Sequence, residues 1–369
     1  MCGIAGVFGL DDPSIAHSMI SCLSHRGPDG KGLWSDSINQ VGNISLSHSR
    51  LAILDVTGSK QPIHSEHGCI LVQNGEIYNQ RLIRENISYP WRTNGDGEAI
   101  LAAHFNAIPP PSVSPEPASG KKKGWFRFSS EKNQALRHID WIRTLNGMWG
   151  FALWDPRYRE LILCRDTLGI KPLMKWQSKD GSLLFASEAK AFRAHPEYVP
   201  KLDTQALFAR LAFEYSIDNT TLFSEVSQVR PGTVETWSLD NLGRAVLTGV
   251  ASFSDYRNNP QNHWDPSVSS KELLHSLRMG LADRLNSDVP VGVVLSGGLD
   301  SSMVAALAKD ASEIAEKPVP KCWTVSENEE NPDFKAAIEV SKALDLEHHC
   351  WTLDEDVFWK KLPNLSWSG

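Results

Sequence analysis

Short apolar segments separated by polar turns run from residue 1 to about residue 240. Helices are predicted at 14–23, with Ser14 or Asp12 as the N-cap, and at 96–107 and 204–213. The mixture of small and large apolar residues at 145–154 is typical of a sheet covered on both faces. These patterns predict a strand-rich α+β domain. Its strands are predicted at 2–8, 44–48, 51–56, 69–73, 145–154, 161–165, 183–187 and 234–237.

The pattern changes after residue 270, where apolar strands and helices alternate. Strands are predicted at 291–295, 321–325 and 348–353, and helices at 271–286, 300–315 and 333–344, with one more helix after the last strand. Such alternation predicts an α/β domain with a parallel, doubly wound sheet. The segment before it is polar and turn-forming. The predicted division is therefore a first domain at 1–248, a linker at 249–270 and a second domain at 271–369.

Composition agrees with a globular protein of two domains. The 369 residues exceed one typical core, and the 41% hydrophobic and 22% charged contents are ordinary. A net charge of -7 without a long basic stripe argues against a nucleic-acid surface. The sequence shows neither an apolar run long enough for a bilayer nor the basic leader of a signal peptide. We therefore expect a cytoplasmic protein without membrane or nucleic-acid partners.

The six cysteines are scattered and form no C-x-x-C pair. This spacing argues against a structural zinc site and against a disulfide framework, and it agrees with a reducing compartment. A different composition marks 109–124, which contains three consecutive prolines and ends in three lysines and a glycine. It is predicted to be a disordered, solvated insertion, with a docking patch as the alternative.

Candidate chemistry begins at Met1-Cys2-Gly3-Ile4. If Met1 is removed, Cys2 carries a thiol and a free α-amine on one residue. The thiolate is a nucleophile, and an α-amine with a pKa near 8 is a base that titrates close to neutral pH. Together they provide the pair that covalent acyl transfer needs. The alternative is an ordinary cysteine buried in a first strand.

A second candidate follows the strand at 291–295. The segment 296–302 reads Ser-Gly-Gly-Leu-Asp-Ser-Ser and leads into a helix. Two glycines allow backbone N–H groups to approach a phosphate, and the helix N-terminus adds a positive dipole end. Asp300 is a candidate ligand for Mg²⁺. The absence of a lysine excludes the common G-x-x-x-x-G-K-[ST] loop, and the alternative is a simple turn.

The motifs together resemble a known family. The N-terminal half is similar to a class II glutamine amidotransferase, and 296–302 resembles the PP-loop of ATP pyrophosphatases. Joined in this order, they resemble glutamine-hydrolysing asparagine synthetase. The resemblance implies a four-layer αββα N-terminal-nucleophile domain, followed by an incomplete PP-loop domain. The segments that carry the first resemblance are Cys2-Gly3-Ile4, Arg26-Gly27-Pro28-Asp29, Arg50-Leu51-Ala52-Ile53, Asn74-Gly75-Glu76, Gly95-Asp96-Gly97-Glu98, 165–173 and Ser187-Glu188.

The resemblance implies that Cys2 attacks the side-chain amide of glutamine. The Asn74 side chain and the Gly75 N–H would stabilise the oxyanion, while Arg50 would bind the substrate α-carboxylate and Asp96 its α-ammonium. The glutamine site would be completed by Leu51, Ile53 and Glu76. Taken singly, Arg50 could be a surface ion pair, Asn74-Gly75 a hairpin turn and Asp96 a helix cap. Arg26 and Arg165 are expected to be structural.

In the second half the resemblance implies ATP as a substrate with Mg²⁺, and no prosthetic group. Aspartate would be adenylated there, and ammonia from glutamine would displace AMP to give asparagine. The implied partners are thus glutamine, aspartate and ATP, and a homodimer is left open. The residues implied for ATP are Val294, Ser296, Gly297, Gly298, Asp300, Ser301, Ser302 and Val325, with Asp300 on Mg²⁺.

Two departures from the family pattern affect these expectations. The chain ends at Gly369, before the second glycine-rich motif of the family, so glutaminase activity is expected to survive while ATP-dependent synthesis is weak or absent. Gly95 stands where relatives usually have serine before the aspartate. The loss of that hydroxyl is expected to weaken the contacts with glutamine. The alternatives are a β-lactam synthetase-like amide former, disfavoured by the intact Cys2, Arg50 and Asn74, and a glutaminase or regulatory fragment that docks through its insertion.

Overall fold

The computed structural model describes residues 1–38, 40–108, 133–254 and 265–368. The chain divides into two compact units, Met1–Asn259 and Pro260–Gly369. The division falls inside the predicted linker, but regular structure occupies both ends of that segment. Strand β12 (Ala245–Ser252) covers its start, and helix α6 (Pro266–Arg284) covers its end. The predicted insertion at 109–124 lies outside the described residues.

Two antiparallel six-stranded sheets form the framework of the first unit over its described ranges. The first sheet has, in order, β10 (Ser227–Gln228), β8 (Met174–Gln177), β9 (Leu183–Ala186), β1 (Gly3–Gly9), β3 (Gly42–Arg50) and β2 (Gly30–Ile38). The second has β12, β11 (Thr233–Leu239), β7 (Glu160–Arg165), β6 (Gly147–Asp155), β5 (Ile70–Ile77) and β4 (Ile63–His64).

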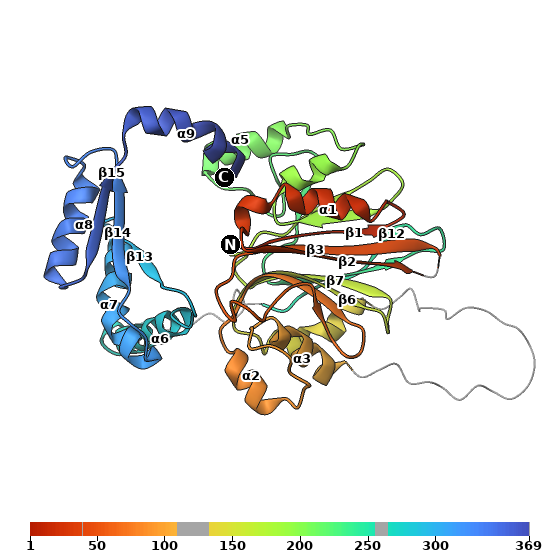
Figure 1. Cartoon of the computed structure of the whole chain (residues 1–369), viewed down its shortest axis with the longest axis horizontal. Helices are drawn as coiled ribbons and strands as arrows, with labels where there is room; N and C mark the ends of the chain where they lie inside the picture. The colour runs from red at the N-terminus through yellow and green to blue at the C-terminus, as the bar shows by residue number, and fades with distance from the viewer. Residues whose placement is uncertain (39, 109–132, 255–264, 369) are drawn as a thin grey trace, which may run out of the picture. The chain divides into compact units, whose positions relative to one another are not determined.

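The two sheets pack face to face between helices, as the alternation of side chains along β1 illustrates. Ile4 and Phe8 belong to the core between the sheets, whereas Ala5 and Val7 belong to the core under helix α1 (Ser14–Ser21). Successive side chains of a strand point to opposite faces, so one strand supplies both layers. Figure 1 shows the sheets stacked between α1 and α3 (Glu98–Ala107). The expected four-layer αββα arrangement is confirmed.

Helices cover the outer face of each sheet. The first sheet packs on α1 and on the 3₁₀ segment Ala189–Ala194. The second packs on α2 (Gln80–Asn86), α3 and α4 (Ile139–Ile142). Helix α5 (Thr204–Phe213) has no buried residue. Pro13 is the N-cap residue of α1, and the Asp12 carboxylate accepts a hydrogen bond from the Ser14 N–H at 2.8 Å.

The structure of the first unit differs from the sequence-based predictions at several places. The segment 51–56 is a loop, because the carbonyl oxygens at its end bind the Arg50 guanidinium instead of a neighbouring strand. Asn74 and Gly75 lie inside β5, paired with Gly150 and Trp149 of β6, and form no hairpin turn. Strand β2 was not predicted, because most of its side chains are exposed and it has little apolar pattern.

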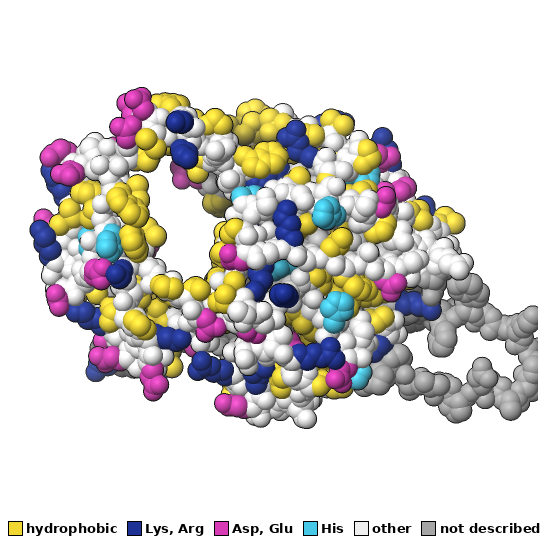
Figure 2. Space-filling view, in the orientation of Figure 1, with side chains coloured by type: hydrophobic (Ala, Val, Ile, Leu, Met, Phe, Trp, Pro, Cys, Tyr) yellow, Lys and Arg dark blue, Asp and Glu magenta, His cyan; other side chains and the backbone are white. Residues whose placement is uncertain are grey.

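The second unit has a parallel sheet in the order β13 (Gly292–Val294), β14 (Lys321–Ser326) and β15 (His348–Thr352). Helices alternate with these strands as predicted: α6, α7 (Leu299–Ala315), α8 (Pro332–Ala343) and α9 (Glu355–Ser368). Its core is small and includes Leu295 and Cys322. Figure 2 shows apolar side chains at the surface of this unit. Among the described residues of its sheet, Val325 of β14 and Trp351 of β15 are exposed. None of the helices in the described ranges is long and apolar enough to cross a membrane.

Candidate active site around Cys2

A pocket of about 250 Å³ opens at one end of the space between the two sheets. It contains every residue predicted for the glutamine site together with residues that were not predicted. The lining residues are Met1, Cys2, His48, Arg50, Leu51, Ile53, Leu54, Ser59, Gln61, Asn74, Gly75, Glu76, Asp96, Met148 and Lys171.

Strand register explains why residues so distant in sequence meet here. Gly3 pairs with Ser49, so the residue before Gly3 adjoins the end of β3 at Arg50. On the facing sheet, Val72 belongs to the core between the sheets, and Asn74 lies two residues further along the same face of β5. Cys2 and Arg50 of one sheet thereby face Asn74 of the other.

The Cys2 thiol is half-buried and held by the backbone of the following loop. The Leu51 N–H donates to Cys2 Sγ at 3.3 Å, and Arg26 Nε donates to the Cys2 carbonyl oxygen at 2.9 Å. Burial raises the pKa of the Cys2 thiol, and it lowers the pKa of the Met1 α-amine. A neutral thiol therefore needs a base to become nucleophilic, and an α-amine in this environment gives up its own proton readily.

Asn74 supplies the best-placed donor for a negative charge in the pocket. Its side chain is 1% exposed, and Nδ2 has no hydrogen-bond partner among the described residues. Pairing of β5 with β6 fixes the backbone on both sides of it. A side chain at Gly75 would overlap the Met148 carbonyl oxygen, so only glycine fits beside Asn74. An unsatisfied buried donor costs free energy, and a bound oxyanion would satisfy it.

Asp96 and Arg50 provide an acidic and a basic group in the pocket. The partly buried Asp96 carboxylate accepts hydrogen bonds from Ile77 N–H at 2.7 Å and from Gln73 Nε2 at 3.0 Å, and burial raises its pKa. The Arg50 guanidinium donates to the carbonyl oxygens of Val56 at 2.6 Å and Asp55 at 2.7 Å. These acceptors are neutral, and Arg50 has no ion pair within the described part of the chain. Its positive charge therefore remains available for a carboxylate.

Lys171 is a pocket residue that the sequence reasoning did not assign. Two residues of the segment 165–173, Arg165 and Asp166, hold its backbone in place. The Arg165 Nε donates to the Lys171 carbonyl oxygen at 2.7 Å, and Asp166 accepts the Lys171 N–H at 3.0 Å. Arg165 is thus structural, as expected. Burial raises the pKa of Glu76 to about 7, with the Asp96 charge as the second cause, and burial lowers the pKa of Lys171.

The remaining unassigned pocket residues have no sequence signal of their own. His48 faces the pocket from β3, and burial lowers its pKa to about 3, so its imidazole is neutral. Ser59 explains the glycine at position 95, since a Cβ at Gly95 would overlap both Ser59 Oγ and Ser59 Cβ. The Ser59 side chain therefore occupies the space that a side chain at position 95 would need.

The predicted phosphate loop lies in the second unit, between β13 and α7. Gly297 has φ +75°, and a Cβ there would lie 2.6 Å from Ala336 Cβ and 2.7 Å from Ala337 N, so glycine is required. The hydroxyls of Ser296 and Ser301 hydrogen-bond to each other at 2.9 Å. Ser302 Oγ is buried and has no hydrogen-bond partner among the described residues. These features form a narrow turn with hydroxyl groups at the start of a 17-residue helix.

The other residues predicted for ATP surround this loop at the ends of the parallel strands. Asp300 is exposed in the first turn of α7, and Val294 and Val325 are 79% and 59% exposed. A mostly apolar pocket of about 310 Å³ lies between α6, α7 and β13, and of the predicted ATP residues it includes Val294 and Ser301. The phosphate loop is therefore open to solvent.

Comparison with known proteins agrees with this division of the chain. The model of the glutamine amidotransferase domain family matches residues 1–107 and 136–245, and the asparagine synthase model matches residues 272–369. Both matches together include every predicted site residue.

The chain is 30% identical over 382 residues to a putative glutamine-hydrolysing asparagine synthetase of Mycobacterium tuberculosis (strain ATCC 25618 / H37Rv), covering 99% of this chain and 52% of that protein. It is 28% identical to glutamine-hydrolysing asparagine synthetase 1 of Bacillus subtilis (strain 168), covering 100% and 52%. A solved glutamine phosphoribosylpyrophosphate amidotransferase of B. subtilis matches with a TM-score of 0.44 and 16% identity, covering 95% of this chain and 65% of that one.

The chain spans about half the length of the curated relatives that it matches. The amidotransferase model alone covers more than half of the present chain. The chain therefore belongs to the glutamine amidotransferase domain family, and within it to the proteins that also carry an asparagine synthase domain.

Proposed function

We propose that the protein hydrolyses glutamine at Cys2 in the cytoplasm and that the ammonia is used to amidate an aspartate activated with ATP. Hydrolysis of glutamine at Cys2 is supported by one pocket, whose lining includes Cys2, Arg50, Asn74 and Asp96. In this pocket Asn74 Nδ2 has no hydrogen-bond partner among the described residues. A thiol, an unsatisfied donor and two opposite charges match the amide, the oxyanion, and the two charged groups of glutamine.

Hydrolysis begins once Met1 has been removed. The free α-amine of Cys2 takes the thiol proton, and Sγ attacks the amide carbon of glutamine. The resulting oxyanion accepts hydrogen bonds from Asn74 Nδ2 and the Gly75 N–H, each worth about 3–4 kcal/mol in comparable sites. The protonated amine gives its proton to the leaving nitrogen, so ammonia departs and a thioester remains. Water then attacks the thioester, releasing glutamate and restoring the thiol.

The rest of the pocket selects the substrate. Arg50 binds the α-carboxylate, because its charge faces only neutral carbonyl acceptors. Asp96 binds the α-ammonium, which restores the ionised form that burial disfavours. Leu51, Ile53 and Glu76 line the pocket beside these groups and complete the fit to a five-carbon substrate.

In the second unit the loop fits the phosphates of ATP. The unpartnered Ser302 hydroxyl and the glycine required at 297 support a phosphate site, in which Ser296, Gly298 and Ser301 take part. Asp300 would hold Mg²⁺ at the start of the helix. ATP supplies the adenylate group that activates an aspartate carboxylate. Val294 and Val325, whose side chains are exposed, would contact the adenosine.

The test is a glutaminase assay on the full chain, with and without ATP, Mg²⁺ and aspartate. Mass spectrometry of the N-terminus should show that Met1 has been removed. Cys2→Ala should abolish glutamate release, because no other group can form the thioester. Cys22→Ala changes another half-buried cysteine of the same unit and should leave activity unchanged. Undiminished hydrolysis by Cys2→Ala would refute the proposed nucleophile, and asparagine formation is measured separately in the same mixtures.

A further inference from the structure

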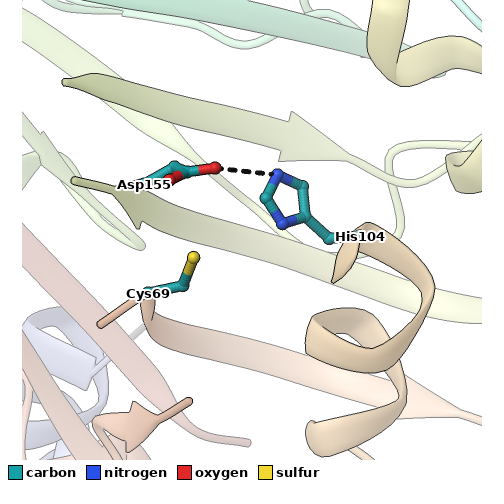
Figure 3. Close-up of side chains that lie close together, drawn as sticks. All are labelled: Cys69, His104 and Asp155. Carbon is teal, nitrogen blue, oxygen red and sulfur yellow. Dashed lines mark ion pairs between the residues drawn. The ribbon is translucent and has the colours of Figure 1, made fainter. Parts of the chain in front are cut away.

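A second cluster of reactive side chains lies in the first unit, apart from the Cys2 pocket. Cys69 precedes β5, His104 is on α3 and Asp155 ends β6. Their exposed fractions are 3%, 1% and 1%. Figure 3 shows the thiol and the imidazole turned towards the carboxylate, and the three ligand atoms lie within 4.8 Å of one another.

The contact between His104 and Asp155 has the spacing of two metal ligands. His104 Nε2 lies 3.5 Å from Asp155 Oδ2, and this nitrogen has no hydrogen-bond partner among the described residues. A hydrogen bond from nitrogen to oxygen is usually about 2.7–3.2 Å long. In a tetrahedral zinc site, Zn–N and Zn–O bonds of about 2.0–2.2 Å place the two ligand atoms about 3.3–3.5 Å apart.

We propose that Cys69 Sγ, His104 Nε2 and Asp155 Oδ2 bind one Zn²⁺ ion. On binding, the Cys69 thiol releases its proton to the solvent and a Zn–S bond forms, while the neutral imidazole gives its lone pair. The thiolate and the carboxylate set two negative charges against the two positive charges of the ion. Three protein atoms leave one position of a tetrahedral site for a water molecule.

Neighbouring groups hold the ligands in place. Arg157 Nε donates to Asp155 Oδ1 at 2.9 Å and Arg157 Nη2 donates to Oδ2 at 2.7 Å, which fixes the carboxylate plane. The Cys69 N–H donates to Ser65 Oγ at 2.9 Å. The Arg157 charge opposes a cation, so we expect an affinity below that of a site with four protein ligands. Its side chain is 12% exposed and thus remains in contact with water, which weakens this repulsion.

Metal binding here would join the start of β5, helix α3 and the end of β6. Asp155 is at the opposite end of β6 from Met148, which lines the Cys2 pocket. The ion is therefore structural and takes no part in glutamine hydrolysis.

The experiment uses the full chain, stripped of metal with a chelator and titrated with Co²⁺ and then with Zn²⁺. One equivalent of Co²⁺ should produce the intense near-ultraviolet absorption of a cobalt–thiolate bond, and Zn²⁺ should remove it. Cys69→Ser and His104→Gln should each lose this absorption. The control Cys164→Ala, which alters a fully buried cysteine of β7, should keep it.

Metal binding by the unmodified chain tests the proposal even if a variant fails to fold. Binding of one zinc per chain, with a rise in thermal midpoint on zinc addition, supports the site. Failure of the unmodified chain to bind either metal would overturn it, as would a cobalt–thiolate spectrum that persists in folded Cys69→Ser. Glutaminase activity should be equal with and without zinc at a temperature at which both forms are folded, so failure of this proposal leaves the proposed function standing.

Discussion

The pocket at Cys2 and the loop at 296–302 are both proposed to bind negative charge, and they differ in how their hydrogen-bond donors are held. Asn74 lies in the middle of a strand with paired neighbours, so its donor is held in place before any substrate arrives. The hydroxyls of Ser296 and Ser301 bond to each other and must exchange that bond for a phosphate. A sheet therefore preorganises its donors, whereas a solvent-exposed turn must reorganise to offer them.

The largest expected effect comes from removing the preorganised donor, the side-chain amide of Asn74. Asn74→Ala should lower the kcat of glutamine hydrolysis by about 10²–10³, since one oxyanion donor is lost. KM should change little, because the donor acts mainly on the transition state. Asn86→Ala, which removes an exposed amide on α2, is the control. A large rise in KM with an unchanged kcat would show that Asn74 binds the ground state instead.

The packing around the pocket can be tested at position 95. Gly95→Ser should destabilise the first unit by about 1–3 kcal/mol in urea unfolding, because the new side chain overlaps Ser59. The double variant Ser59→Gly with Gly95→Ser should recover most of this loss, as expected for two residues that share one space. Gly30→Ser, at a glycine with open space, serves as the control. Additive effects of the two changes would contradict a shared space.

The charge balance of the pocket predicts a pH effect. Folding raises the pKa of Glu76 from 4.5 to about 7, so the folded protein binds this proton more tightly than the unfolded chain. Between those values this group lowers stability as pH rises. Glu76→Gln stays neutral, so its unfolding free energy relative to the native chain should increase by about 2–3 kcal/mol from pH 4.5 to 7. Glu85→Gln, at an exposed position on α2, controls for loss of charge, and a flat difference for Glu76→Gln would contradict the raised pKa.

The smallest expected effect concerns the open loop. Asp300→Asn should weaken MgATP binding about tenfold, or about 1.4 kcal/mol, in calorimetric titration, because the loop loses a ligand for Mg²⁺. It should leave glutamine hydrolysis without ATP unchanged. Asp310→Asn, on the same helix but paired with Arg278, is the control. Equal ATP affinity of the Asp300 variant and the native chain would remove Asp300 from the proposed site.

Residues at the Cys2 site could be predicted because short motifs carry them. Cys2, Arg50 and Asn74 each stand in a recognisable segment, and the structure places all three in one pocket. Local pattern alone would have misassigned Asn74-Gly75, since this dipeptide favours a hairpin turn. Only the pairing of β5 with β6, which joins residues more than 70 positions apart, keeps it in a strand.

The residues that were missed depend on packing rather than on local pattern. His48 and Ser59 belong to no motif in the sequence, and they reach the pocket because two sheets close around it. The same holds for Cys69, His104 and Asp155. Their spacing resembles no metal motif, so the sequence argued against structural zinc, and the cluster is visible only after α3 is packed against the sheet. Helix α5, by contrast, begins and ends at the predicted residues because its limits are set locally, with Asp203 as N-cap.

The contacts of Arg50 have a consequence for how substrate recognition reaches the sulfur. The guanidinium holds the carbonyl oxygens at the far end of the loop 51–56, and the near end of that loop, at Leu51, donates its N–H to Cys2 Sγ. If Arg50 binds the substrate α-carboxylate as proposed, that carboxylate would compete with these carbonyl oxygens for the guanidinium and would displace the loop. We therefore expect the Leu51 N–H to shift relative to Cys2 Sγ when glutamine binds, but not when an amide without the carboxylate binds.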